Sequence, residues 1–110
     1  MSAKSEYHLS VIEEFSLFPG GRLKKHGPDS GEEFRDDILI PLFEKYDSLV
    51  VDLTGAVTYG SSFLDESFGE LGKRYGLDAV EAKLSLIAND DPMLVDTIWE
   101  KVRIAAKEYK

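Results

Sequence analysis

The stretch VVDLTGAVTYGSSFL, residues 50–64, decides the fold, because one hydrophobic pattern ends in it and another begins. Residues 47–53 (DSLVVDL) are a short apolar run with β-branched residues, which predicts a buried strand. From residue 62 the apolar residues repeat at helical spacing, which predicts an amphipathic helix that ends at Gly76. The residues of this helical stripe are Leu64, Phe68, Leu71 and Tyr75.

Two further strands are predicted outward from this unit. Residues 7–18 (YHLSVIEEFSLF) are rich in apolar and β-branched residues and indicate one or two short strands. Residues 82–88 (AKLSLIA) alternate between polar and apolar side chains as a strand does. Gly69 and Gly72 each weaken a helix interior by about 1 kcal/mol relative to alanine. We therefore expect something to approach this backbone closely, either the protein's own sheet or a docked partner.

Two further helices flank these strands. Residues 27–46 predict a helix that Ser30 and Glu33 cap reciprocally and that Pro41 kinks or restarts. The final helix, within residues 89–110, has Pro92 in its first turn and an aspartate, at 90 or 91, as its cap. Together these elements predict an α/β domain with a small, mostly mixed sheet of about four to five strands and three helices.

The chain of 110 residues suits one domain, expected over residues 7–110, and residues 1–6 are expected to be flexible. It contains no cysteine, so disulfides and thiolate metal sites are excluded. The N-terminus has no apolar core typical of a secretory signal, and the densest apolar run, residues 38–43, is too short to span a membrane. We expect a cytoplasmic protein without membrane contact.

The net charge of −8 disfavours nucleic acid as a partner, because an acidic surface repels phosphates. One basic cluster stands out, and acidic residues follow it directly, so local pairing is expected to neutralise it. The cluster consists of Arg22, Lys24, Lys25 and His26. His8 and His26 lie far apart in the sequence, and no nucleophile, base and orienting group can be combined. We predict no enzyme activity, no metal site and no cofactor.

Asp52 is unusual, because it ends an otherwise apolar strand. A carboxylate there must accept hydrogen bonds or shift its pKa. Donors are expected from the following loop, at Thr54 or Thr58. Two roles are compatible with this position of Asp52: it shapes the following loop through hydrogen bonds, or it takes part directly in the protein's function.

The arrangement of an apolar strand ending in Asp52, a loop and a serine pair at a helix start resembles the signature of STAS domains, the fold of bacterial anti-anti-sigma factors. Three motifs extend the resemblance over residues 15–75: PGGR at 19–22, GPDSGEEFR at 27–35 and GSSFLDESFG at 60–69. With these motifs in order, the chain is similar to the STAS-like domain family of unknown function.

The resemblance implies a regulatory role. In regulatory STAS domains the second serine of the pair is phosphorylated, and Ser62 occupies that position, with Ser61 beside it. Gly60 and Phe63 stand where those proteins have an acid and a glycine. The implied partner is a GHKL-type ATPase that acts as a serine kinase or an anti-sigma factor.

Two functions and two roles for the serines remain open. The leading hypothesis is an interaction module that presents loop 54–62 and the following helix to a protein partner. Its partner-binding or loop-shaping residues are Asp52, Thr54, Thr58, Tyr59, Gly60, Phe63, Asp65 and Glu66. The alternative is a sensor of nucleotides or other small ligands, with Asp52 and Arg22 lining a pocket at this loop. Ser62 is either a phosphorylation site or a plain helix cap completed by Asp65; the two roles can coexist. The oligomeric state is not predicted.

Overall fold

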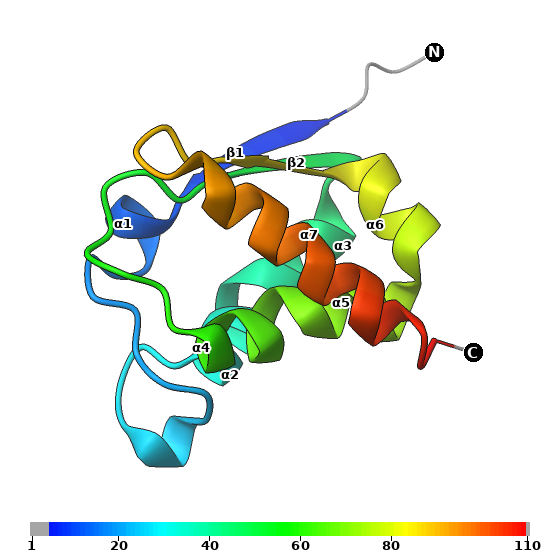
Figure 1. The fold of residues 1–110 in the computed structure, drawn as a ribbon. Helices are drawn as coiled ribbons and strands as arrows, with labels where there is room; N and C mark the ends of the chain where they lie inside the picture. Colours follow the sequence, from blue (N-terminus) through cyan, green and yellow to red (C-terminus); the bar gives the residue numbers. More distant parts are fainter. Residues whose placement is uncertain (1–4, 110) are drawn as a thin grey trace.

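The computed structural model describes residues 5–109, which form a three-stranded sheet with helices packed against it (Figure 1). The strands are β1 (Glu6–Ser10), β2 (Ser48–Asp52) and β3 (Leu84–Ile87). Their order in the sheet is β1-β2-β3, and both neighbouring pairs are parallel. The α/β class is confirmed, whereas the expectation of a mixed sheet with four to five strands is wrong for the described residues.

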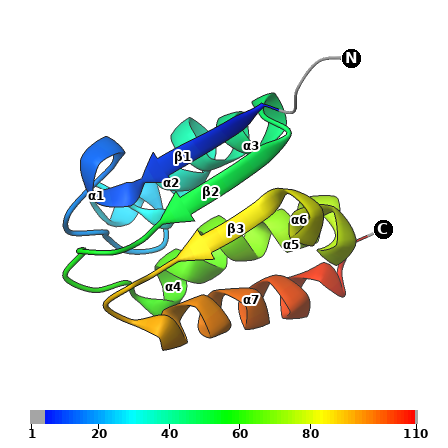
Figure 2. The ribbon, with the colours of Figure 1, turned by 90° about the horizontal axis from the view of Figure 1, so that it is seen from above.

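One face of the sheet is apolar and the other is largely polar. Strand residues alternate, so that Leu9, Val51 and Leu86 lie in register on the face that the helices cover. His8, Val50 and Ser85 lie in register between them and point the opposite way. The helices lie on one side of the sheet, as the view from above shows (Figure 2).

The helices differ in number and extent from the prediction. The short elements near the N-terminus are α1 (Val11–Glu14) and the 3₁₀ turn η1 (Lys24–His26). Two longer helical runs follow: the run 31–45 consists of α2 (Gly31–Phe34), η2 (Arg35–Leu39) and α3 (Ile40–Lys45), and the run 61–75 consists of α4 (Ser61–Leu64), η3 (Asp65–Gly69) and α5 (Glu70–Tyr75). The last helices are α6 (Leu77–Lys83) and α7 (Pro92–Ala106). Among the described residues, no helix combines the length and the apolar character needed to cross a membrane.

The N-terminal prediction was partly wrong. Residues 1–4 of the expected flexible end lie outside the described residues, but the Ser5 carbonyl already accepts from the Ser48 amide at 3.1 Å, and Glu6 starts β1. Of the one or two strands expected within residues 7–18, one is present as β1, and the single-turn helix α1 follows it. The Glu14 carboxylate accepts a hydrogen bond from the Ser10 amide at 3.2 Å, which stabilises the first turn of this helix.

The helical run 31–45 begins as predicted and contains an unpredicted irregularity. Ser30 Oγ accepts from the Glu33 amide at 3.1 Å, whereas the Glu33 carboxylate accepts from the Asp29 amide at 3.2 Å instead of from Ser30. A π-helical stretch over Arg35–Leu39 ends two residues before Pro41, where a disturbance was expected because the proline ring and missing N–H do not fit regular α-helical bonding. The run 61–75 contains a π-helical stretch of the same length, Asp65–Gly69, without a proline, so Pro41 alone does not account for this geometry.

The run 61–75 ends as predicted at Gly76, which has φ of 85°. The short helix α6 follows it, so the predicted strand at 82–88 shrinks to Leu84–Ile87. The close approach expected at Gly72 is made by α7 and not by the sheet, because a Cβ at Gly72 would lie 2.3 Å from the Val102 carbonyl oxygen. At Gly69 the nearest such contact is 3.8 Å, so this glycine is not required by packing.

Candidate functional site

The serine pair stands exposed in the first turn of the run 61–75. This helix begins at Ser61, and its N-cap residue is Gly60. Both serines are exposed. The prediction that Ser62 caps the helix with Asp65 as its partner is therefore wrong, because the cap position lies two residues earlier and Asp65 makes other contacts. Gly60 is also exposed, and a Cβ built there meets nothing within 4 Å.

Loop 54–60 is held by hydrogen bonds from both neighbouring strand ends. The Asp52 carboxylate accepts from the Thr54 amide at 2.9 Å, which gives this strand-end acid a partner in the loop. The Thr54 hydroxyl accepts from the Asn89 amide at 3.0 Å, and the Asp90 carboxylate accepts from the Gly55 amide at 3.0 Å. The loop after β2 is thus tied to the loop after β3. Thr58, the other donor considered for Asp52, is exposed.

Two aromatic residues anchor the end of this loop. The Tyr59 hydroxyl donates to the Leu53 carbonyl at 3.3 Å, and its ring packs against Phe63 with centroids 5.9 Å apart. Phe63 is fully buried and stacks on Phe34 at 5.7 Å. It is therefore excluded as a direct partner contact and instead fixes the helix start in the core. A Cβ at Gly31 would lie 2.6 Å from the Phe63 carbonyl oxygen, so this glycine lets the two helix starts meet.

A network of charged side chains connects the serine pair with the C-terminal helix α7. The Lys101 ammonium lies 2.8 Å from Ser61 Oγ and 2.8 Å from an Asp65 oxygen. Arg22 reaches the other Asp65 oxygen at 3.4 Å and Glu66 at 3.5 Å. Sequence reasoning missed Lys101, which lies in α7, 40 residues from Ser61.

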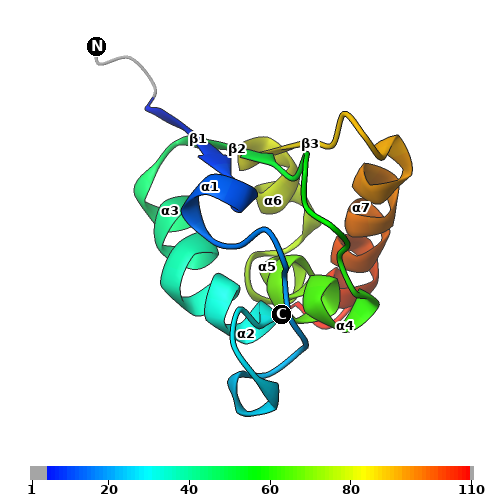
Figure 3. The ribbon, with the colours of Figure 1, turned by 90° about the vertical axis from the view of Figure 1, so that its left-hand side faces the viewer.

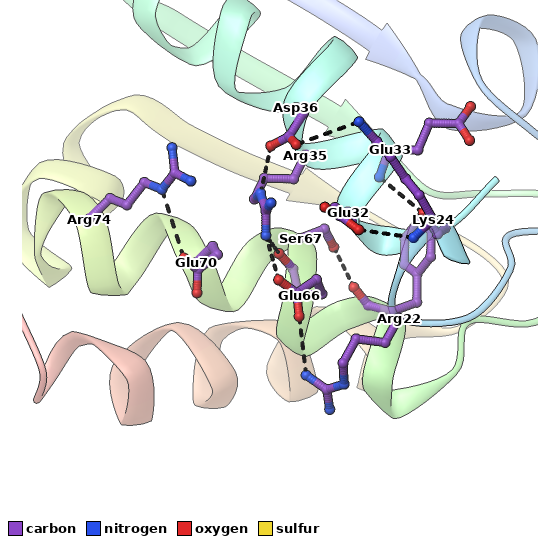
Figure 4. Close-up of polar contacts among 12 residues, drawn as sticks. Arg22, Lys24, Glu32, Glu33, Arg35, Asp36, Glu66, Ser67, Glu70 and Arg74 are labelled. Atoms are coloured by element: carbon purple, nitrogen blue, oxygen red, sulfur yellow. Dashed lines mark hydrogen bonds and ion pairs between the residues drawn. The ribbon is translucent and has the colours of Figure 1, made fainter. Parts of the chain in front are cut away.

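Arg35 closes this network on the inside of the molecule (Figure 4). Its side chain is only 10% exposed and pairs with Glu66, while Nε donates to Asp36 at 2.8 Å. Burial pulls the pKa of Arg35 down, but the hydrogen bonds to Asp36 and Glu66 outweigh it, so the guanidinium stays charged. The pair joins the π-helical stretches of both helical runs. Glu66 therefore serves internal packing and is not a free partner contact.

Two of the four residues of the basic cluster, Arg22 and Lys24, form ion pairs within the chain. Besides the two ion pairs of Arg22, the Lys24 ammonium lies 3.7 Å from Asp36. This agrees with the expected local pairing, although the acids that hold Arg22 lie on the distant helical run and not directly after the cluster.

Loop 54–62 and Arg22 line two separate cavities instead of the one pocket expected at Asp52. Arg22 lines a cavity of about 320 Å³ together with Asp65, Lys73 and Lys101. The loop lines a different cavity of about 280 Å³, which neither Arg22 nor Asp52 lines. No group of three or more side chains suited to metal binding occurs within residues 5–109.

Comparison with known proteins identifies the family of the chain. A family model described as STAS-like domain of unknown function (DUF4325) matches residues 30–93, more than half of the chain. The matched region contains the serine pair, Asp52 and Arg35, whereas Arg22 and Lys101 lie outside it. No curated protein and no solved structure matches the chain significantly.

Proposed function

Because this chain belongs to the family of STAS-like domains of unknown function, we propose that it is a non-enzymatic, regulatory protein-interaction module. It presents loop 54–62 and the start of the following helix to a protein partner. The observation that carries the proposal is the exposure of both serines in the first turn of a helix whose preceding loop is braced from two strands. A braced loop keeps its shape on binding, which lowers the entropy lost in a complex.

Phosphorylation of the serine pair is the proposed switch. A phosphate adds a charge of about −1.5 to −2 at neutral pH. On Ser61 it would stand beside the Lys101 ammonium, now 2.8 Å from the hydroxyl, and would compete with Asp65 for that cation. On Ser62 it would stand at the open end of the helix on the solvent side. Either phosphate adds repulsion to a chain of net charge −8, which favours release of a partner that places acidic side chains opposite the serine pair.

The partner class follows from the family resemblance: a GHKL-type ATPase that acts as a serine kinase or an anti-sigma factor. The test is to co-purify the tagged protein with each GHKL-type ATPase of its source organism and to map phosphates by mass spectrometry after ATP is added. We expect one ATPase to bind and to modify Ser61 or Ser62. Ser62→Glu should weaken that complex, whereas Ser85→Glu, an exposed serine in β3, should not. Binding by none of the ATPases would remove the partner class, and a phosphate only elsewhere would remove the switch.

The alternative, a small-ligand sensor, is supported by the cavity of about 320 Å³, which three cations line: Arg22, Lys73 and Lys101. Each cation already lies within ion-pair distance of a carboxylate, so an anionic ligand would have to replace Asp65 or Glu108. A thermal-shift screen with nucleotides tests this function, since a ligand of the native state raises the melting temperature. An unchanged melting temperature at millimolar nucleotide would argue against it.

A further inference from the structure

An exposed apolar patch lies at the end of the sheet where the strands terminate. Leu17, Phe18 and Val57 are 43%, 65% and 64% exposed. The Val57 amide donates to the Leu17 carbonyl at 3.2 Å, so the loop after α1 and the loop after β2 lie side by side (Figure 3). Adjacent exposed apolar side chains with a polar rim are typical of protein-interaction sites.

An acidic cavity of about 280 Å³ adjoins this patch, and Val57 belongs to both. The apolar part of its lining comes from the loop after β2 and from the start of α7, and its carboxylates come from the loop after β3. The lining residues are Leu53, Ala56, Val57, Thr58, Tyr59, Asp90, Asp91 and Leu94. The volume is sufficient for one long side chain, and the lining contains no cation.

Within residues 5–109, the carboxylates of this cavity have no cation as an ion-pair partner. None of the ion pairs between described residues involves Asp90 or Asp91. Asp90 uses one oxygen for the Gly55 amide, which leaves the other oxygen outside that bond. The pKa of Tyr59 is raised, mainly by burial and in addition by the negative charges of Asp90 and Asp52. The electrostatic field of these acids therefore reaches the tyrosine that lines the cavity.

We infer that this surface docks a segment of the partner protein in which a lysine or arginine is flanked by apolar residues. The cation enters the cavity between Tyr59 and the two aspartates, and its apolar neighbours cover Leu17, Phe18 and Val57. Charge complementarity selects a basic residue, and the apolar patch selects a protein segment over a free amine, which would leave the patch uncovered. The inference rests on the proposed function in requiring a protein partner, but not on serine phosphorylation.

The test is a titration of the ¹⁵N-labelled protein, followed by NMR, with a heptapeptide that has a central arginine, two leucines on each side and serine at both ends. We expect saturable shifts at residues 16–18, 54–60 and 89–91. A peptide with citrulline, the neutral analogue of arginine, should bind about tenfold more weakly, because it loses the charged hydrogen bond. Free butylguanidine should give no saturable shift.

Matched variants localise the charge effect. Asp90→Asn keeps an oxygen for the Gly55 amide and removes the charge, and Asp91→Asn removes the second charge. Both should weaken the arginine peptide about tenfold, whereas Asp78→Asn, an exposed acid on α6, should not change its affinity.

The inference is overturned if the arginine peptide gives no saturable shift at millimolar concentration, if citrulline binds equally well, or if shifts map elsewhere. Butylguanidine that binds as tightly as the peptide would identify a small-cation site instead. These outcomes are independent of the kinase assay. If an ATPase binds the protein but the arginine peptide does not, only this inference is overturned. If the peptide binds but none of the ATPases does, only the proposed partner class is overturned.

Discussion

Two glycines three residues apart in one helical run are expected to respond to alanine in opposite directions. Gly72 faces the backbone of α7, where an added Cβ would lie 2.3 Å from the Val102 carbonyl oxygen and 3.1 Å from two of its carbons. Backbone atoms cannot rotate away as a side-chain end can, so Gly72→Ala must push α5 and α7 apart. At Gly69 the nearest contacts would be 3.8 and 3.9 Å, which is ordinary packing distance.

The expected magnitudes follow from two competing contributions. Alanine is favoured over glycine in a helix interior by about 1 kcal/mol. Gly69→Ala receives this benefit without a clash, so its free energy of unfolding should rise by up to about 1 kcal/mol. Gly72→Ala also receives it, but overpacking costs about 1–3 kcal/mol and separation of the helices loosens the core around the buried Val102. Since the clash is with backbone atoms, we expect the upper part of that range, a net loss of up to about 2 kcal/mol.

Urea unfolding followed by far-ultraviolet circular dichroism measures both variants against the original chain. The midpoints should move in opposite directions with unchanged slopes, because neither variant alters the surface exposed on unfolding. An equal gain in both variants would show that α5 and α7 do not approach as closely as described. An equal loss would show that glycine is needed in this run for another reason.

Three further outcomes are expected. Gly31→Ala should lower the free energy of unfolding by about 1–3 kcal/mol, because its Cβ would lie 2.6 Å from the Phe63 carbonyl oxygen; thermal unfolding checks this. Ser30→Ala should lower it by about 1 kcal/mol through loss of the helix cap, measured by urea unfolding, with Ser30→Gly losing less. The pKa of Asp36 is lowered in the folded protein, mainly by the hydrogen bond from Arg35. The charged carboxylate therefore stabilises the fold at a pH above the ordinary pKa of aspartate, and this contribution is lost as the pH falls through the lowered pKa of the folded state. The stability difference between the original chain and Asp36→Asn should therefore be largest near neutral pH and shrink below about pH 4, and a constant difference would contradict it.

The parts of the fold that were predicted depend on local patterns. The β-branched run before Asp52, the apolar stripe after residue 62 and the glycine at 76 each specify their element through neighbours in sequence. The helix start was misplaced for a local reason as well: glycine and serine are both accepted at an N-cap, and the sequence offers Gly60, Ser61 and Ser62 in a row.

The missed features depend on contacts between distant residues or on short segments. Val11–Glu14 is too short for its apolar residues to distinguish a helix from a strand. The contact of Lys101 with Ser61 joins positions 40 residues apart, and no local pattern indicates it. Gly72 signalled a close approach, but only the packed structure identifies α7 as the element that makes it.

The contact between Ser61 and Lys101 has a practical consequence, because α7 also carries the protein's only tryptophan, Trp99. Its indole is partly buried against the core, two positions from Lys101 along the helix. Side chains two positions apart on a helix do not face each other, so a chemical change at Ser61 that pulls on Lys101 reaches the indole only if α7 moves as a whole. Emission from Trp99 therefore offers a label-free test of whether α7 shifts against the core when Ser61 is modified.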